Sequence, residues 1–200
     1  MPGPIDFYFE FASPYGYMAA CRIDDLAARH GREVAWRPIM LGAVFKVTGS
    51  KPNMAIPLKG PYLLKDVPRS AKFMGLPLKL PPRLPMNSLA ASRAFWWLAD
   101  DEPDRAKGLA LAVYKAHWAE GRDMSSPDQV AEAAATIGID PASLDVGIRG
   151  ESVKQRLKDE TQAAIDRGVF GSPFIVVDDE PFWGVDRLDQ IERRLAGEVF

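Results

Sequence analysis

The sequence predicts an α/β fold in which one sheet is assembled from the two ends of the chain, with a long helical segment inserted between them. Strand-like runs occur near the N-terminus, at residues 5–12 and 33–39, and again at residues 174–177 and 181–183. The residues between these two pairs carry helix patterns and turn formers instead. Because two strands alone do not form a stable sheet, we expect the four strands to pair with one another.

The first strand turns directly into a helix. The run from Ile5 to Phe11 is rich in aromatic residues, as is typical of a buried strand. Ser13 then stands at a helix N-cap position with Pro14 at the first helical position, and the helical spacing continues to Gly31. The free N–H groups at such a helix start favour an anion or a thiolate. Ser13 is therefore the first candidate for chemistry, with a purely structural capping role as the plain alternative.

After the second strand the chain becomes rich in proline and glycine. Residues 33–39 alternate in polarity and are expected to form a parallel neighbour of the first strand, with a right-handed crossover. Residues 41–87 contain eight prolines and four glycines, which predicts only short helices and turns. The segment is nevertheless too apolar for a disordered linker. We expect a packed, loop-rich wall over a site.

Helices follow, and then the chain returns to strands. Helix starts are expected at Asn87, Asp104, Ser126 and Asp140, with a further helix over 151–167, strands at 174–177 and 181–183, and a last helix from Asp186 to Leu195. The order is therefore β-α-β, a helical insertion, then α-β-β-α. This order predicts a thioredoxin-like domain from residues 1–40 and 151–200, with residues 41–150 as an inserted helical domain that forms the substrate wall.

Composition excludes several classes of function. The net charge of −2 gives no general reason to expect nucleic acid or an anionic membrane as a partner. Cys21 is the single cysteine, so neither an internal disulfide nor a zinc cluster of cysteines is expected, and no metal site is expected. No basic segment leads into an apolar run at the N-terminus, and no stretch approaches the ~20 apolar residues of a membrane span. We expect a cytoplasmic protein.

Three segments, in the right order at both ends of the chain, resemble a known family. Residues 7–15, 168–174 and 183–188 are similar to segments of the 2-hydroxychromene-2-carboxylate isomerases and the related kappa-class glutathione transferases. The resemblance covers nearly the full chain. It implies a DsbA-like thioredoxin fold with an inserted helical domain, glutathione as cofactor, and a homodimer, the last on fold-level analogy alone.

The resemblance also implies roles for individual residues. The Cys-x-x-Cys of disulfide oxidoreductases is absent, with Ser13 and Gly16 in its place, which excludes dithiol redox chemistry there. By resemblance, Ser13 donates a hydrogen bond to the glutathione sulfur, and the Ser172 backbone, before a cis-Pro173, pairs with the glutathione cysteine. The following residues complete the glutathione site, the last two at its γ-glutamyl end: Trp183, Gly184, Val185 and Asp186.

The substrate contacts that the resemblance implies come from the inserted wall. Lys46, Asn53 and Asn87 would face the carboxylate and hydroxyl groups of the substrate. Each has a plainer interpretation, since Lys46 suits a solvated surface, Asn53 suits a turn and Asn87 suits a helix cap. Asp186 likewise suits a cap of the last helix.

The implied reaction is a cis–trans isomerisation of 2-hydroxychromene-2-carboxylate or a similar intermediate of aromatic degradation. Two alternatives stay open: a kappa-type transferase that conjugates glutathione to electrophiles, and a non-catalytic thioredoxin-like module that binds peptides. Two positions depart from the family pattern. Gly16 replaces a small hydroxyl residue, and Ser172 replaces an aliphatic residue. The loop after Gly49 also differs in length.

Overall fold

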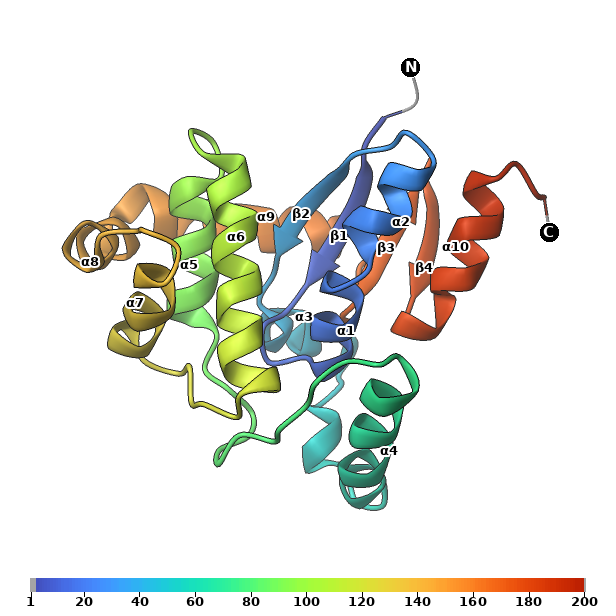
Figure 1. The fold of residues 1–200 in the computed structure, drawn as a ribbon, viewed down its shortest axis with the longest axis horizontal. Coiled ribbons are helices and arrows are strands. Elements are labelled where there is room, and N and C mark those ends of the chain that lie inside the picture. The colour runs from blue at the N-terminus through green and yellow to red at the C-terminus, as the bar shows by residue number, and fades with distance from the viewer. Residues whose placement is uncertain (1–2, 200) are drawn as a thin grey trace.

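One mixed sheet organises the computed structural model, which describes residues 3–199 (Figure 1). Its strand order is β2-β1-β3-β4. Strand β1 pairs in parallel with β2 and antiparallel with β3, and β3 pairs antiparallel with β4. The four strands are β1 (Ile5–Phe9), β2 (Val34–Pro38), β3 (Phe174–Val177) and β4 (Glu180–Trp183). The prediction of a single sheet built from both ends of the chain is confirmed.

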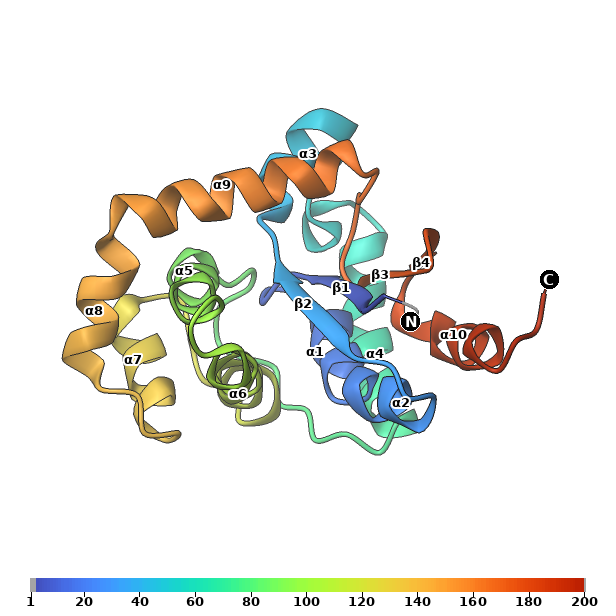
Figure 2. The same ribbon diagram turned by 90° about the horizontal axis from the view of Figure 1, so that it is seen from above.

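Helices cover both faces of the sheet. Seen from above, α3 and α9 lie on one side of it, and α1, α2 and α10 lie on the other (Figure 2). The bounds of these helices are α1 (Pro14–Ala20), α2 (Ile23–Arg29), α3 (Leu41–Thr48), α9 (Glu151–Asp166) and α10 (Leu188–Leu195).

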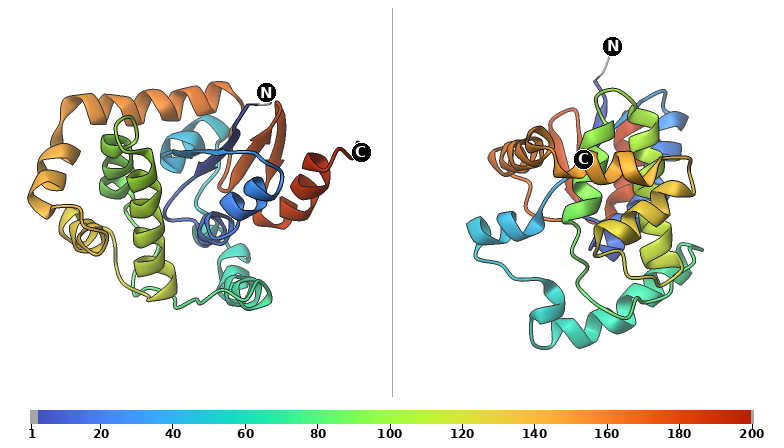
Figure 3. Two further views of the ribbon diagram at one scale, coloured as in Figure 1. Left: turned by 45° about the horizontal axis from the view of Figure 1, so that its top comes forward. Right: turned by 90° about the vertical axis from the view of Figure 1, so that its left-hand side faces the viewer.

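The inserted helices form a group beside β2. Helix α9 runs from this group back to the sheet, so it joins the insertion to the strands that follow (Figure 3). Helix α4 projects from one end of the molecule (Figure 1). Besides α3, residues 41–150 contain α4 (Lys59–Phe73), α5 (Leu89–Leu98), α6 (Pro103–Tyr114), α7 (Pro127–Ala135) and α8 (Pro141–Arg149).

An aromatic cluster joins the sheet to the insertion. Alternate residues of a strand point to one face, and here Phe7, Phe9 and the following Phe11 are all fully buried on the same side. The ring of Phe9 lies 5.8 Å from the rings of both Phe95 on α5 and Tyr114 on α6. Burying each such ring contributes roughly 2–3 kcal/mol. The opposite face of the sheet has its own small core, which includes Tyr8, Ile39, Val44, Ala164, Phe174 and Val176.

Two helix predictions were wrong. The helix after Ser13 is broken into α1 and α2 around Cys21. The expectation of only short helices in residues 41–87 fails at α4, which is 15 residues long. Pro61 is tolerated there because it lies in the first turn, where no intrahelical N–H bond is needed, and Pro68 costs one interior hydrogen bond. Helix α4 is held by its buried Val67 and by a hydrogen bond from Tyr15 on α1 to Asp66.

Three of the expected helix starts are confirmed. Ser126 forms a complete capping box with Gln129, Asp140 caps α8, and α9 begins at Glu151. Three differ: the N-cap of α5 is Ser88 and not Asn87, α6 begins one residue before Asp104, and the last helix begins at Leu188 after a 3₁₀ turn over Val185–Arg187. Within residues 3–199 no helix has the length and apolar character to cross a membrane.

Candidate functional site

Ser13 is fixed at the start of α1 by two hydrogen bonds. Its Oγ accepts the N–H of Gly16 at 3.0 Å and donates to the carbonyl oxygen of Ser172 at 2.9 Å. The residue is only 8% exposed. The capping role is thus confirmed, and the same hydroxyl also reaches the segment before Pro173. Its hydrogen already points at an acceptor across the site, so it is placed to serve a stronger acceptor there.

The Ser172–Pro173 segment connects the two ends of the chain. The peptide bond between these residues is cis. The Ser172 hydroxyl accepts the N–H of Glu10 at 2.9 Å, and the Pro173 carbonyl accepts the N–H of Gly184 at 3.0 Å. Ser13, Ser172 and the Gly184 turn are therefore joined through consecutive hydrogen bonds. The structure brings together three segments that lie far apart in the sequence.

The turn after β4 presents a carboxylate beside this junction. Gly184 has a φ of 110°, a conformation that favours glycine, and a Cβ atom there would lie 2.3 Å from Oδ1 of Asp186. The Asp186 side chain is 70% exposed, with Oδ2 3.3 Å from the Arg187 guanidinium. Val185 is half-buried, and the 3₁₀ turn that it begins contacts α1. An accessible anion thus lies in the turn that packs against the Ser13 helix.

Trp183 forms an exposed aromatic wall near the same segment. Its side chain is 54% exposed, and its ring packs edge-on against Phe170 with centroids 4.9 Å apart. A Cβ atom on Gly171 would lie 2.3 Å from the indole nitrogen of Trp183. The ring therefore lies directly over the backbone that precedes Ser172.

The three residues expected to face the substrate are not joined to this cluster by any hydrogen bond or ion pair within residues 3–199. Lys46 lies exposed in the last turn of α3, and Asn53 lies exposed at the start of a 3₁₀ turn. Asn87 accepts the N–H of Leu89 through Oδ1 at 3.2 Å, but the N-cap of α5 is Ser88, so Asn87 lies one residue before the cap. Their contact with substrate stays a prediction.

The sequence analysis missed two residues that hold the approach to Ser13. Tyr114 donates its hydroxyl to the Glu10 carbonyl at 3.1 Å, and Trp118 donates its indole N–H to the Phe11 carbonyl at 3.0 Å. Trp118 lies in a π-helical segment, Lys115–Ala119, that continues α6. Such segments are frequent at functional sites. The sequence signal is the four-residue spacing of two aromatic residues with polar tips, which places both on one helix face.

Glu10 is a buried carboxyl beneath the same turn. It is 4% exposed, and its carboxyl oxygens accept the N–H groups of Leu41 at 3.1 Å and of Ala12 at 3.5 Å. Burial raises the pKa of the Glu10 carboxyl above its usual value. Because Leu41 is the first residue of α3, Glu10 links the turn before Ser13 to the start of the helix that carries Lys46.

This arrangement offers a hydroxyl donor, an exposed carboxylate and free backbone edges around one junction, with Cys21 elsewhere as the only thiol. Within residues 3–199 no group of His, Cys, Asp or Glu side chains is placed to hold a metal ion.

Comparison with known proteins assigns the family. The chain matches the DSBA-like thioredoxin domain over residues 4–196. It is 30% identical over 197 residues to a 2-hydroxychromene-2-carboxylate isomerase of Sphingobium xenophagum, an alignment that covers 98% of this chain and 99% of the relative. It is 25% identical to glutathione S-transferase kappa 1 of Homo sapiens, over 98% of this chain and 92% of that relative.

A solved structure of a 2-hydroxychromene-2-carboxylate isomerase superposes with a TM-score of 0.84 at 31% identity, over 96% of this chain and 94% of that one. This agreement extends across the sheet and the inserted helices alike. The chain therefore has the DsbA-like thioredoxin fold and belongs to the 2-hydroxychromene-2-carboxylate isomerase family.

Proposed function

We propose that this protein is a glutathione-dependent cis–trans isomerase that acts on 2-hydroxychromene-2-carboxylate or a similar intermediate of aromatic degradation. The observation that carries the proposal is the hydrogen-bonded junction of Ser13, Ser172 and the Gly184 turn. Relatives named as isomerases of this kind are about 30% identical to the chain, whereas those named as kappa-class transferases are 25–28% identical. Isomerisation is therefore favoured over conjugation of glutathione to electrophiles.

The residues at the junction fit glutathione. The exposed carboxylate of Asp186 suits the ammonium of the γ-glutamyl group, because a charge-assisted hydrogen bond is about twice as strong as a neutral one. The Ser172 backbone suits strand-like pairing with the cysteine of the tripeptide. Glycine at positions 171 and 184 leaves room for Trp183 and Asp186 to lie close to this backbone. With these two contacts made, the sulfur of glutathione would lie toward Ser13.

When bound, glutathione would supply a nucleophilic thiolate for reversible addition to the conjugated side chain of the substrate. Ser13 redirects its hydroxyl hydrogen from the Ser172 carbonyl to the sulfur and so lowers the free energy of the thiolate relative to the thiol. Lys46 and Asn53, with Asn87, hold the substrate carboxylate and hydroxyl groups. A cation beside the developing enolate stabilises it electrostatically.

The test is calorimetric titration with glutathione between about pH 6 and pH 9, with proton release recorded. We expect binding, with the thiol proton released near neutral pH, and loss of that release in Ser13→Ala. Ser126→Ala is the matched control, because it removes an equivalent helix cap far from the site. Isomerisation of the chromene carboxylate is then assayed for the same variants.

Other results of these two assays would favour one of the two alternative functions. Binding of glutathione with conjugation of electrophiles but no chromene isomerisation would favour a kappa-type transferase. No binding up to about 10 mM, a Kd weaker than any useful cofactor affinity, would leave the peptide-binding module as the leading interpretation. The expected homodimer is tested separately by light scattering of the purified protein.

A further inference from the structure

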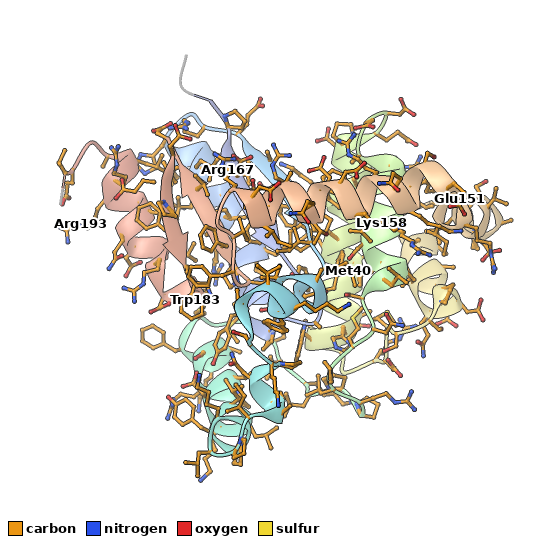
Figure 4. All side chains as sticks on the ribbon, turned by 180° about the vertical axis from the view of Figure 1, so that it is seen from behind. Met40, Glu151, Lys158, Arg167, Trp183 and Arg193 are labelled. Carbon is orange, nitrogen blue, oxygen red and sulfur yellow. The ribbon has the colours of Figure 1, made fainter. Side chains whose placement is uncertain are left out.

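A second candidate site lies on the face of the sheet covered by α3 and α9. It is a pocket of about 310 Å³ between α3, α5 and α9. Figure 4 views the molecule from this side and shows Lys158 on α9 above Met40 at the start of α3. The floor is apolar and is formed mainly by Met40, Leu89, Leu157 and Ile165. None of the lining residues belongs to the Ser13 cluster, which lies at the start of α1.

The pocket is bordered by cations and by no carboxylate. Arg93 reaches it from α5, and Lys154 and Lys158 reach it from successive turns of α9. Like charges four residues apart on a helix repel one another. The positive charge of Lys154 is neutralised by an ion pair with the exposed Glu151 at 2.6 Å. Among residues 3–199, the side chains of the half-buried Arg93 and the exposed Lys158 make no hydrogen bond or ion pair, and the Nε atom of Arg93 is buried without a hydrogen-bond partner. The hydrogen bond from Lys154 lowers the pKa of Glu151, and the charges of Lys158 and Arg93 lower it further, so Glu151 acts on both cations through space without bonding to either.

The other cations around α9 are neutralised. Arg156 pairs with Glu160 at 2.8 Å, and Arg37 pairs with Asp6 at 2.7 Å. Arg167 also pairs with Asp6. An unpaired buried donor is unfavourable, and these arginines have a bonded carboxylate whereas Arg93 has only the through-space charge of Glu151. The absence of a carboxylate bonded to Arg93 indicates that the pocket can bind an anionic ligand.

We propose that this pocket binds a small aromatic carboxylate, with the carboxylate between Arg93 and Lys158 and the ring against Met40 and Leu157. A guanidinium recognises a carboxylate through two parallel hydrogen bonds. A methionine sulfur makes favourable contacts with aromatic rings. The volume is at the lower end of the range for ligand pockets, which suits one or two fused rings. This site goes beyond the proposed isomerase function and does not depend on it.

The probe is 2-naphthoate, titrated calorimetrically into the full chain without glutathione at low salt, with 2-naphthylmethanol as its uncharged counterpart. We expect the carboxylate to bind at least about tenfold more tightly than the alcohol. Arg93→Gln and Lys158→Gln should each weaken binding of the carboxylate about tenfold, because each removes a charge-assisted contact. Lys72→Gln, which removes an exposed lysine on α4, should leave binding unchanged.

Two further variants make the assignment specific. Ala43→Phe fills the pocket from α3 and should abolish binding while α3 and α9 stay folded, as checked by circular dichroism. Ser13→Ala should leave binding of naphthoate unchanged. Equal binding of acid and alcohol, unchanged binding in both cation variants, or loss of binding in Ser13→Ala would each overturn the proposal. A chain that fails to bind glutathione but binds naphthoate through Arg93 would refute the proposed function and support this site.

Discussion

The Ser172 hydroxyl oxygen lies 2.9 Å from the position that a Cβ atom on Gly16 would occupy. The hydroxyl oxygen of Tyr114 lies 2.8 Å from the same position. The two departures from the family pattern, at positions 16 and 172, are therefore in contact. A glycine at position 16 is required because Ser172 and Tyr114 already fill the space beside it, and their hydroxyl groups are held by Glu10.

Replacing Gly16 should destabilise the protein. Gly16→Ala forces Ser172 and Tyr114 apart, and overpacking of this kind typically costs about 1–3 kcal/mol of unfolding free energy. The added Ser172→Ala removes one of the two obstructing oxygens, so the double variant should be more stable than the sum of the single effects implies. Urea denaturation of the four proteins measures this coupling. Strict additivity would show that Gly16 is not limited by this contact.

Ser13→Ala should remove isomerase activity with a small effect on stability. The lost cap to the Gly16 N–H costs about 1 kcal/mol. The expected loss of rate is far larger, because the hydroxyl that would face the sulfur is gone. Comparing activity and urea midpoints with those of Ser126→Ala separates the two roles. Equal activity losses in both variants would mean that Ser13 serves only as a cap.

Tyr114→Phe and Trp118→Phe should slow the reaction by misplacing Ser13. Each removes a donor to a backbone carbonyl just before Ser13. The Phe11 carbonyl loses the bond from Trp118 at a cost of about 1–3 kcal/mol, whereas the Glu10 carbonyl keeps the N–H of Ser13 at 2.9 Å, so Tyr114→Phe costs less. Trp96→Phe is the matched control, since the Trp96 indole donates to the Pro38 carbonyl at the end of β2.

A positioning role predicts a lower kcat in the first two variants with nearly unchanged KM for glutathione, and normal kcat in Trp96→Phe. Urea denaturation should show losses of similar size in Trp118→Phe and Trp96→Phe, and a smaller loss in Tyr114→Phe, whose Glu10 carbonyl keeps the Ser13 N–H. If kcat falls equally in Trp96→Phe, the effect reflects general loss of packing.

His117 should make the protein less stable as the pH falls. The side chain is fully buried, and burial lowers the pKa of its imidazole below the usual value near 6.5. The unfolded chain therefore takes up a proton that the folded chain does not, so the stabilisation is present above about pH 6.5 and is lost as the pH falls below it. His117→Asn should flatten the decline in unfolding free energy between about pH 7 and pH 5. The same decline in both proteins would contradict this assignment.

The sequence predicted the fold well because its strands and caps are locally encoded. The aromatic run of β1 and the Ser126 capping box each carry their own signal. Helix α4 was not predicted from the sequence, because its two prolines argue against a helix and its packing against α1 outweighs them. The break between α1 and α2 was not predicted either, since the apolar residues keep their helical spacing across it.

The candidate site was predicted only in part. Ser13 was predicted from the helix start, Ser172 and the Gly184 turn were named from a resemblance, and the hydrogen bonds that join them follow from the fold. The contact of Gly16 with Ser172 could not be predicted, because no local sequence pattern indicates a contact between residues so distant in sequence. Trp118 is buried, as aromatic residues of a helix usually are, but its indole donor also serves the turn before Ser13.

The pairing of β1 with β3 has a consequence for synthesis of the chain. The hydrogen bond between Glu10 and Ser172 closes a loop of 162 residues. During translation, β1 and its aromatic side chains leave the ribosome long before β3 exists, so one edge of β1 stays unpaired while most of the protein is made. Contacts so distant in sequence form slowly, and exposed strand edges promote aggregation. The Ser13 junction is thus among the last parts of the molecule to assemble, and a nascent chain that stops before Ser172 has no such junction at all.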